Sequence, residues 1–398
     1  MSMSLSPSPS CTSTWAHSSL KSNAATTPPS YDRPVVVGGT GNRGVVASAS
    51  YEARANGVTS AMPVRHARHP CRGLVVVPAH HAKCRQAPEE VFSILRSLTP
   101  FVEGISMDEA FLDVSGLRLH HEDPGQMGVE IRSRRRVEAE PSGSVGVARN
   151  KFLAKLVSKA SKPDGLREVA AGTEVEFLHA LPATRLWGVG AATSAALERL
   201  GIATAGAPAS TPVATLRRHL GATMGTMLHD LAWGKDERAV DRDGAVKSIS
   251  VEQTSEQDLA DRSLVEAELL RHCERLSGRM RRAGKLGKVP AVKVRLADFE
   301  AVHRRLTLAD PTNTGRDVFR AGMALLADID LDRCAVRLVG EGMSDLCDSA
   351  APRQPTTHHE WEDMAIAVDR VHRRFGDEAV VPARIVATSE SITERGVS

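Results

Sequence analysis

An acidic pair lies inside a long apolar stretch of this chain. The stretch from Phe101 to Gly116 reads FVEGISMDEAFLDVSG, which predicts two strands around a tight corner with Asp108 and Glu109 at the corner. Because neighbouring side chains of a strand point to opposite faces, the two carboxylates converge only at a corner or bulge. A pair held there could ligate Mg²⁺, which prefers oxygen ligands. The alternative is a surface acidic pair in a turn.

Two further patterns predict local structure. The string SVGVARNKFLAKLVSKASKPDG begins at Ser144 and predicts a strand that runs into a helix ending before Pro163. After Trp187, the residues Gly188, Val189 and Gly190 form a glycine turn between two short helices. Such a turn exposes backbone N–H groups at a helix N-terminus, where phosphate binds well. We expect contact with a DNA backbone there; the alternative is a plain helical hairpin.

A G-x-G-x-x-G pattern from Gly39 to Gly44 follows the β-branched run PVVVGG. A dinucleotide-binding fold requires a helix immediately afterwards and an acidic residue about 20 residues further on. The residues that follow are VVASASY, which favour a strand, and the segment from Ser60 to His69 contains no acid. We therefore predict a strand-to-strand turn. A nucleotide-dependent oxidoreductase is the rival reading, and it requires NAD(P) binding.

Composition and charge narrow the class of protein. The chain has 398 residues, 41% of them hydrophobic and 25% charged, which allows two to four globular domains. No apolar run reaches ~18 residues and no charged start precedes an apolar block, so we expect no membrane span or secretory signal. The six cysteines form no C-x-x-C pair or zinc spacing, which favours a reduced, cytoplasmic protein.

The distribution of charge is more informative than the net charge of +3. Between Arg271 and Arg305 there are 11 Lys or Arg and three acids. Such a patch can neutralise phosphates, and the alternative is a solvated helix face. An aromatic content of 4% argues against a single-strand binder that stacks bases. The first 30 residues contain ten Ser, four Thr and four Pro, a composition that predicts disorder.

Together these strings resemble the Y family of translesion DNA polymerases, from about Pro34 to about Leu346. SMDEAFLDVSG is similar to the second metal-ligand motif of the family, and the string from Ser144 to Gly165 is similar to its palm strand and helix. GVVASASYEAR resembles the fingers segment that holds the triphosphate. LWGVGAATSAALERLGI resembles the helix-hairpin-helix of the thumb, and KVRLADFEAVHRRLTL a strand pair of the little finger.

The resemblance implies an α+β multidomain, right-handed polymerase. Its expected parts are a low-complexity segment in place of the first palm strand (1–33), small fingers (34–79), a ferredoxin-like palm (80–168), a helix-hairpin-helix thumb (169–236), a linker (237–246), an α/β little finger (247–347) and a C-terminal tail (348–398). Its expected partners are primer-template DNA and dNTPs, and we expect a monomer that tolerates damaged templates. The C-terminal region has no clear sliding-clamp peptide, so clamp binding stays open.

The resemblance also implies roles for individual residues. The chemistry is attack of a primer 3′-hydroxyl on the α-phosphate of a dNTP, assisted by two Mg²⁺ ions. Asp108 and Glu109 would ligate metal, with Glu109 also the catalytic carboxylate. The triphosphate would be held by Ser48, Tyr51, Arg54 and Lys162. DNA would be bound by Gly188, Val189, Gly190, Lys293, Arg295, Arg304 and Arg305.

Two residues of the family pattern are missing. The family requires a first-strand Asp that bridges both metals, and counting back from Pro34 by the spacing of other members lands on Thr14. The only Asp before Asp108 is Asp32, which is out of register. The aromatic steric gate against ribonucleotides is absent too. We therefore expect the first palm strand to be missing, and the rival function is a catalytically dead protein that still binds primer-template DNA.

The genetic code suggests an origin for this gap. Between Pro9 and Asn23, the third base of each codon can be read together with the first two bases of the next codon. In this shifted frame the codons permit I-L-H-V-D-M-G-A-F-F-A-Q-V-E, which is the missing motif of the family, with its Asp at the expected register. Trp15 has a single codon and forces one departure, a Gly where a second Asp is usual. The hypothesis is that residues up to about 30 are a frame-shifted reading. The alternative is a genuine Ser/Pro tail on a shortened protein.

Overall fold

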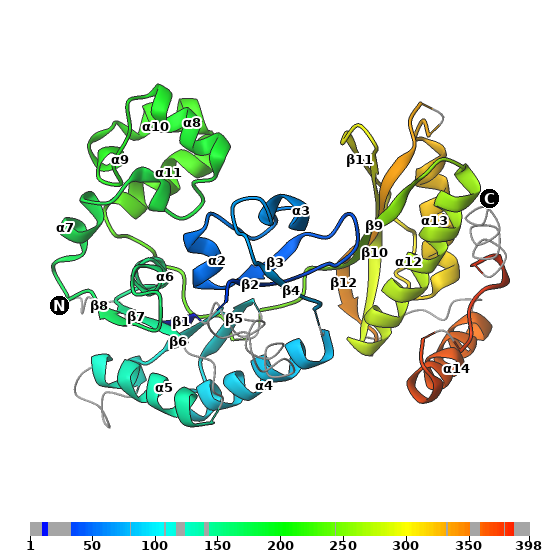
Figure 1. The fold of residues 1–398 in the computed structure, drawn as a ribbon, viewed down its shortest axis with the longest axis horizontal. Coiled ribbons are helices and arrows are strands. Elements are labelled where there is room, and N and C mark those ends of the chain that lie inside the picture. Colours follow the sequence, from blue (N-terminus) through cyan, green and yellow to red (C-terminus); the bar gives the residue numbers. More distant parts are fainter. Residues whose placement is uncertain are drawn as a thin grey trace. The chain divides into compact units, whose positions relative to one another are not determined.

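The structure is a computed structural model. It describes residues 10–14, 33–79, 81–106, 109–116, 124–138, 143–242, 244–331, 333–350, 359–377 and 379–385. The chain divides into two units, Met1–Gly244 and Ala245–Ser398, with the boundary inside the predicted linker (Figure 1). Within the described ranges, no helix combines the length and apolar character that crossing a membrane requires.

A five-stranded sheet forms the palm in the order β5-β6-β1-β7-β8. Its strands are β5 (Val102–Ser106), β6 (Glu109–Asp113), β1 (Ser10–Thr14), β7 (Ser144–Ala148) and β8 (Leu166–Glu168). β5 and β6 pair antiparallel around the predicted corner, with a register shift between Gly104 and Ser106. The corner between apolar strands is therefore confirmed, while Asp108 lies outside the described residues.

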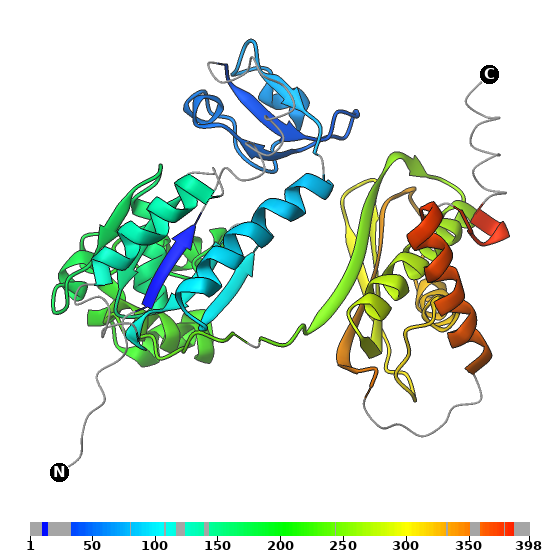
Figure 2. The ribbon, with the colours of Figure 1, turned by 90° about the horizontal axis from the view of Figure 1, so that it is seen from below.

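β1 overturns the expectation that the first palm strand is missing. Its five residues form the central strand of the palm, antiparallel to β6 on one side and to β7 on the other, and Figure 2 shows it as the dark blue arrow. Strand pairing uses main-chain N–H and C=O groups, which every residue here carries. A Ser- and Thr-rich sequence can therefore occupy this place, and the prediction of disorder is wrong for these five residues.

Helices cover both faces of the palm sheet. α4 (His81–Leu98) and α5 (Pro124–Glu138) pack on one face and form a core with β5, β6 and β7. α6 (Lys151–Ala160) covers the other face. Its backbone approaches Gly146 so closely that a Cβ there would lie 2.2 Å from the Ala154 carbonyl oxygen. Glycine at this position of β7 therefore sets how near α6 lies to the sheet.

The fingers are a small three-stranded sheet with two short helices. Its order is β3-β2-β4, with β2 (Val35–Gly38), β3 (Val46–Ala49), β4 (Val75–Val77), α2 (Tyr51–Ala55) and α3 (Val64–Ala67). β2 and β3 pair antiparallel across the glycine pattern, so the strand-to-strand turn is confirmed. The Ser50 hydroxyl caps α2 by accepting the Ala53 N–H at 3.2 Å.

The thumb is helical and shares a core with α6. Its elements are α7 (Glu174–His179), the 3₁₀ helix η2 (Ala183–Arg185), α8 (Ala191–Arg199), α9 (Ala207–Ser210), α10 (Val213–Leu220) and α11 (Ala222–Ala232). Phe152 and Leu153 of α6 belong to the same apolar cluster as Leu197 and Leu228 of the thumb. The predicted glycine turn between helices is confirmed by η2 and α8.

Asn150 joins α6 to the end of the thumb. Its Oδ1 accepts the Leu153 N–H at 3.0 Å, which caps α6, and its Nδ2 donates to the Gly234 carbonyl oxygen at 2.8 Å. The side chain is buried, 6% exposed, so neither bond can be replaced by bulk water. One amide therefore fixes both the start of α6 and the chain that leaves α11.

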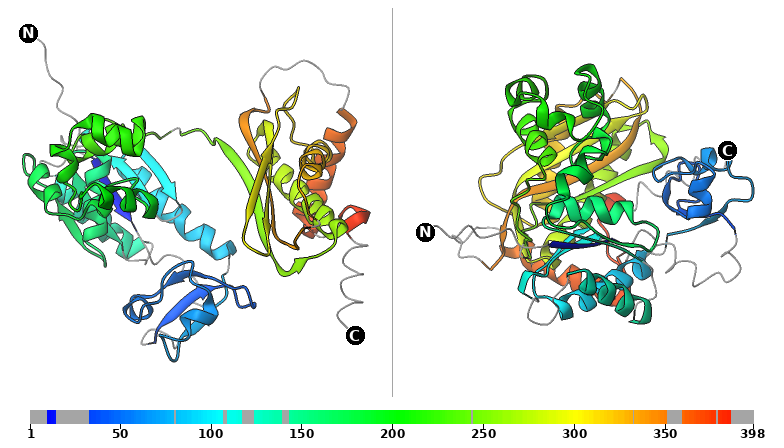
Figure 3. Two further views of the ribbon diagram at one scale, coloured as in Figure 1. Left: turned by 90° about the horizontal axis from the view of Figure 1, so that it is seen from above. Right: turned by 90° about the vertical axis from the view of Figure 1, so that its left-hand side faces the viewer.

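The second unit contains a four-stranded antiparallel sheet with two helices on one face (Figure 3, left). Its elements are β9 (Ser248–Leu259), α12 (Arg262–Arg282), β10 (Lys285–Leu296), β11 (Ala301–Arg305), α13 (Gly315–Ala327) and β12 (Val336–Asp348), in the sheet order β11-β10-β12-β9. α12 and α13 bury the apolar face of the sheet. This mixture of strands and helices agrees with the α/β domain expected over residues 247–347.

The predicted C-terminal tail contains a helix, α14 (His359–Phe375). Two bonds from the Arg281 guanidinium of α12 to Asp369 of α14, at 2.7 and 2.8 Å, attach it. The same guanidinium donates to the Asn313 carbonyl oxygen at 2.7 Å. Arg316 also lies 4.1 Å above the Trp361 ring. α14 is therefore packed on the little finger.

An unpaired carboxylate lies in the core of the second unit. Glu341 of β12 is 1% exposed, and neither of its carboxylate oxygens has a hydrogen-bond partner among the described residues. Burial raises the pKa of Glu341 well above its ordinary value of 4.5. As the pH rises past that ordinary value, the unfolded chain ionises first. Stability is therefore lost progressively between the unfolded and the folded pKa.

We expect Glu341→Gln to stabilise the protein by an amount that grows as the pH rises from about 5 to about 8, because Gln cannot ionise. The gain should be about 1.4 kcal/mol for each pH unit between the ordinary and the raised pKa, because only the ionisation of Glu341 is removed. Thermal unfolding across this pH range measures it. The control is Glu256→Gln on exposed β9. Parallel stability–pH curves for both variants would contradict the assignment.

We expect Asn150→Ala to lower the free energy of unfolding by about 1–3 kcal/mol, because it removes a helix cap and a second buried hydrogen bond. Urea denaturation measures the loss. Ser194→Ala is the matched control, because the half-buried Ser194 donates its hydroxyl to Glu198 of its own helix, at 3.0 Å, in a bond exposed to solvent. An Asn150 variant no less stable than this control would show that the amide does not join α6 to the thumb.

Candidate active site

Glu109 lies at the start of β6, where the sheet turns the predicted corner. Its Oε2 accepts a hydrogen bond from the Lys155 ammonium of α6 at 2.7 Å. Both side chains are partly exposed, so the pair lies at the surface of the palm. Asp108, the other predicted metal ligand, is outside the described residues. The one predicted carboxylate that can be placed is therefore neutralised by a lysine.

A second lysine of α6 lies one helical turn earlier. The Lys151 ammonium bonds Glu103 Oε2 at 2.5 Å and the Ala239 carbonyl oxygen at 3.0 Å. It also lies 5.0 Å from the centre of the Phe111 ring. Positions four residues apart lie on the same face of a helix, so Lys151 and Lys155 both face β5 and β6. α6 therefore lines the acidic edge of the palm with two cations.

Trp187 of the thumb packs against Phe111 and Lys155. Its ring stacks on Phe111 of β6, with centroids 6.0 Å apart. Lys155 and Arg238 lie 4.9 and 4.4 Å from its centre. Arg238 is held by Asp236, which also accepts the Phe152 N–H of α6 at 3.0 Å. Palm, thumb and linker therefore meet beside Glu109.

The sequence did not single out Lys155, Lys151, Asp236 or Arg238. Two lysines at helical spacing next to a strand that carries an acid are a signal that could have found the first two. The role of Asp236 depends on the path of the linker, for which the sequence carries no pattern. Trp187 was noted only as the residue before the glycine turn.

Thr14 takes the place in β1 opposite Glu109. Thr14 pairs in register with Glu109 of β6 and with Ser144 of β7. The described residues contain no group of three His, Cys, Asp or Glu side chains placed to hold a metal ion. A two-metal polymerase site needs carboxylates that bridge the ions, and the neighbours of Glu109 here are a threonine, a serine and a lysine. Among the described residues, those beside Glu109 therefore do not fit two Mg²⁺ ions.

The predicted triphosphate residues come from two places. Ser48 is a buried residue of β3, and Tyr51 and Arg54 begin and nearly end α2. Arg54 is exposed and its Nε donates to the Ala49 carbonyl oxygen at 2.9 Å. Burial raises the pKa of the Tyr51 hydroxyl, while the charge of Arg54 lowers it and that of Asp164 raises it. Asp164 follows Lys162 by two residues, so Tyr51 lies within electrostatic range of the Lys162 loop.

The glycine turn of the thumb presents main chain to solvent. Gly188 and Gly190 are exposed, whereas Val189 is half-buried against the thumb core. Gly188 has φ +87°, which favours glycine. No side chain caps the N-terminus of α8 after Gly190. The first N–H groups of α8 are therefore available to an acceptor outside the protein, such as a phosphate.

The four predicted cations of the little finger do not lie on one face. Arg304 pairs in register with Val292, a core residue, so it belongs to the helix-covered face at the edge strand β11. The other three alternate with core positions and lie on the open face: Lys293, Arg295 and Arg305. Lys293 bonds Glu252 at 2.6 Å. The sequence identified the cations but not the face that each occupies.

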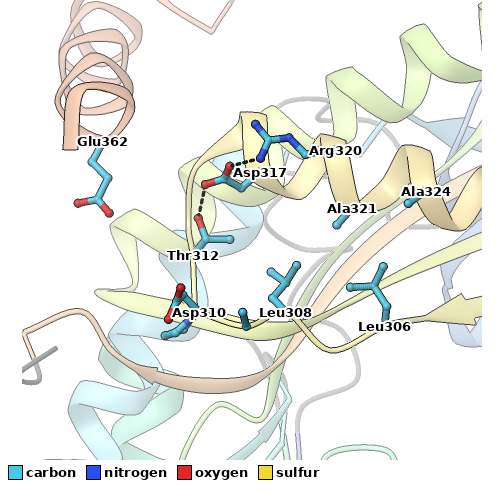
Figure 4. Close-up of a pocket in the computed structure, with 11 residues that line it drawn as sticks. Leu306, Leu308, Asp310, Thr312, Asp317, Arg320, Ala321, Ala324 and Glu362 are labelled. Carbon is cyan, nitrogen blue, oxygen red and sulfur yellow. Dashed lines mark hydrogen bonds and ion pairs between the residues drawn. The ribbon is translucent and has the colours of Figure 1, made fainter. Parts of the chain in front are cut away.

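A cavity of about 330 Å³ lies in the second unit, between α13 and the segment before it (Figure 4). Asp317 accepts the Thr312 hydroxyl at 3.2 Å and pairs with Arg320 at 3.7 Å. The lining residues are Leu306, Leu308, Ala309, Asp310, Pro311, Thr312, Asp317, Arg320, Ala321, Ala324 and Glu362. No predicted site residue is among them, so the cavity is separate from the candidate active site.

Comparisons with known protein sequences identify a family. Residues 23–159 match the impB/mucB/samB family, and residues 246–357 match its C-terminal domain. DNA polymerase IV of Dehalococcoides mccartyi is 36% identical over 356 residues, covering 89% of this chain and 91% of that protein. DNA polymerase IV of Caulobacter vibrioides is 38% identical over 358 residues, covering 89% and 88%.

Solved structures agree on the fold. A Y-family DNA polymerase chimera built on Dbh superposes with a TM-score of 0.79 at 22% identity, covering 85% of this chain and 99% of the chimera. An insertion ternary complex of Dbh DNA polymerase gives a TM-score of 0.64 at 22% identity, covering 84% and 98%. The chain therefore belongs to the Y family of translesion DNA polymerases, the impB/mucB/samB family, and within it is similar to the bacterial DNA polymerases IV.

Proposed function

We propose that this chain binds primer-template DNA and an incoming dNTP as a translesion polymerase, but that its template-directed synthesis is severely impaired. One observation carries the proposal. Thr14 lies in the central palm strand directly opposite Glu109, where a two-metal mechanism calls for a carboxylate. Threonine cannot supply the negative charge that draws two divalent ions together.

The reaction of the family requires groups that bind metal and stabilise charge. A primer 3′-hydroxyl attacks the α-phosphate of a dNTP, and Mg²⁺ supplies both activation of the hydroxyl and neutralisation of the pyrophosphate. Of the residues in this chain, Asp108 and Glu109 would ligate metal. The Lys155 ammonium that bonds Glu109 competes with a cation for the same carboxylate. The Glu109 carboxylate is therefore already paired with a cation of the protein, Lys155.

Triphosphate binding does not depend on the missing carboxylate. Tyr51 and Arg54 of α2 and Lys162 after α6 offer a hydroxyl and two cations, with Ser48 behind them in β3. The proximity of Tyr51 to Asp164 supports a common site for the fingers residues and the Lys162 loop. Cationic donors of this kind bind β- and γ-phosphate oxygens. We therefore expect dNTP binding to persist when synthesis does not.

DNA binding rests on two surfaces, each within its own unit. The turn at Gly188 and Gly190 presents N–H groups that suit a phosphate. The open face of the little-finger sheet carries Lys293, Arg295 and Arg305. Such contacts are to phosphates, so binding should be nearly independent of sequence and should weaken steeply with salt. A catalytically dead DNA-binding protein is the limiting case of this proposal, and Thr14 favours it.

The test compares binding with synthesis in one preparation. Fluorescence anisotropy with a primer-template duplex should give salt-dependent binding, while gel-based primer extension should run several orders of magnitude below that of Caulobacter vibrioides DNA polymerase IV under the same conditions. Appreciable Mg²⁺-dependent extension that Glu109→Ala abolishes would overturn the proposed impairment. Failure to bind the duplex would overturn the DNA-binding part.

The register of β11 yields a matched pair of variants. Arg305→Ala removes a cation from the open face, so the slope of log Kd against log salt should fall by about 0.9. Arg304→Ala removes a neighbouring cation from the helix-covered face and should change the slope much less. Anisotropy titrations at several salt concentrations measure both. An equal effect of the two substitutions would show that the open face is not the DNA-binding surface.

A further inference from the structure

The sequence of β1 conflicts with its place in the palm. Cys11 and Ser13 lie one residue apart in the central strand, between β6 and β7. Their cross-strand partners are Leu112, Val147, Ala110 and Val145. Each of these four partners is at most 1% exposed and belongs to the core beneath α4 and α5. Positions 11 and 13 therefore have only buried apolar partners in the sheet.

Such positions call for apolar residues. Directly opposed residues of antiparallel strands share a face of the sheet, and a central strand covered on both faces is ordinarily rich in Val, Ile and Leu. All five residues of β1, Ser-Cys-Thr-Ser-Thr, are small, and four of them are hydroxyl residues. A conflict between a local sequence and the fold around it counts against that sequence as one that specifies the fold.

The alternative reading frame removes the conflict. Aligned by the two bases that each codon pair shares, I-L-H-V-D takes the places of residues 10–14. Position 11 becomes Leu and position 13 becomes Val, the types that the core calls for. Position 14 becomes Asp, opposite Glu109. The codons permit this reading, and the register places its Leu and Val opposite apolar core residues and its Asp opposite Glu109.

A separate observation marks the end of the altered segment. The match to the impB/mucB/samB family begins at residue 23, where the alternative reading stops. From about residue 23 onward the chain therefore follows the family in the frame as written. One inserted or deleted base near codon 23 is enough to join the two frames.

We propose that residues 10–23 are an out-of-frame translation of a buried palm strand and the segment after it, and that position 14 is where this chain has lost a carboxylate. The catalytic half of this inference rests on the proposed function; the structural half does not. A genuine Ser/Thr strand, selected as it stands, is the alternative that the following experiments exclude or establish.

The coding DNA gives the first test. The inference requires the third bases of the Cys11, Thr12 and Ser13 codons to be C, G and G, because only these bases give His, Val and Asp in the shifted frame. Sequencing codons 1–40 from the source strain reads them directly. Any other base at these places overturns the inference, whatever the activity of the protein.

Protein stability gives the second test. In the full chain, Cys11→Leu with Ser13→Val should raise the Tm by roughly 3 °C or more, because both positions share a face with core residues. The control is Ser250→Val on exposed β9, which should leave the Tm nearly unchanged. An unchanged or lower Tm for the β1 variant would overturn the structural half of the inference.

Metal binding gives the third test, with Thr14→Asp compared against its neutral isostere Thr14→Asn. Electron paramagnetic resonance with Mn²⁺ should show binding that Asp strengthens and Asn does not, and primer extension should rise by roughly 100-fold or more for Asp alone. Equal Mn²⁺ affinity of the two variants would overturn the assignment of position 14. If the unaltered chain extends primers well, the proposed impairment fails, while the codon and Tm tests still decide the inference.

Discussion

The palm depends on a central strand that is paired along both of its edges. Without β1, β6 and β7 would have unpaired edges in the middle of the sheet, each with a row of exposed N–H and C=O groups. β6 begins with Glu109, and β7 leads into α6, which carries Lys155. The strand therefore sets the positions of both partners in the candidate site through main-chain pairing, although its own residues bring no charge there.

A second set of contacts holds the thumb against this frame. Asn150, at the start of α6, donates to the chain that leaves the thumb, and Asp236 of that chain accepts an N–H of α6. Trp187 lies over Phe111 and Lys155. These interactions tie the linker to the palm at the point where the acidic corner lies. The polar groups of the site are therefore engaged with one another.

Patterns local in sequence predicted much of the fold. The corner before Glu109, the strand and helix after Ser144 and the turn between Gly39 and Gly44 each depend on neighbouring residues. β1 could not be predicted, because a strand held only by main-chain pairing leaves no apolar alternation in its sequence. The spacing of Lys151 and Lys155 could have suggested two cations on one face of α6, but not that Lys155 bonds Glu109, 46 residues away in the sequence. The face occupied by Arg304 follows only from the register of β11.

Helix α14 supplies the counter-ion of a largely buried arginine in the second unit. The Arg281 guanidinium shares its donors between Asp369 of α14 and the Asn313 carbonyl oxygen ahead of α13. A chain truncated after residue 358 would take from that largely buried cation its hydrogen-bonded carboxylate, leaving it the Asn313 carbonyl oxygen and the charge of Glu274. Removing one partner of a buried ion pair is destabilising. A truncation that preserves this pair therefore has to extend beyond the family's C-terminal domain, to the end of α14 at Phe375.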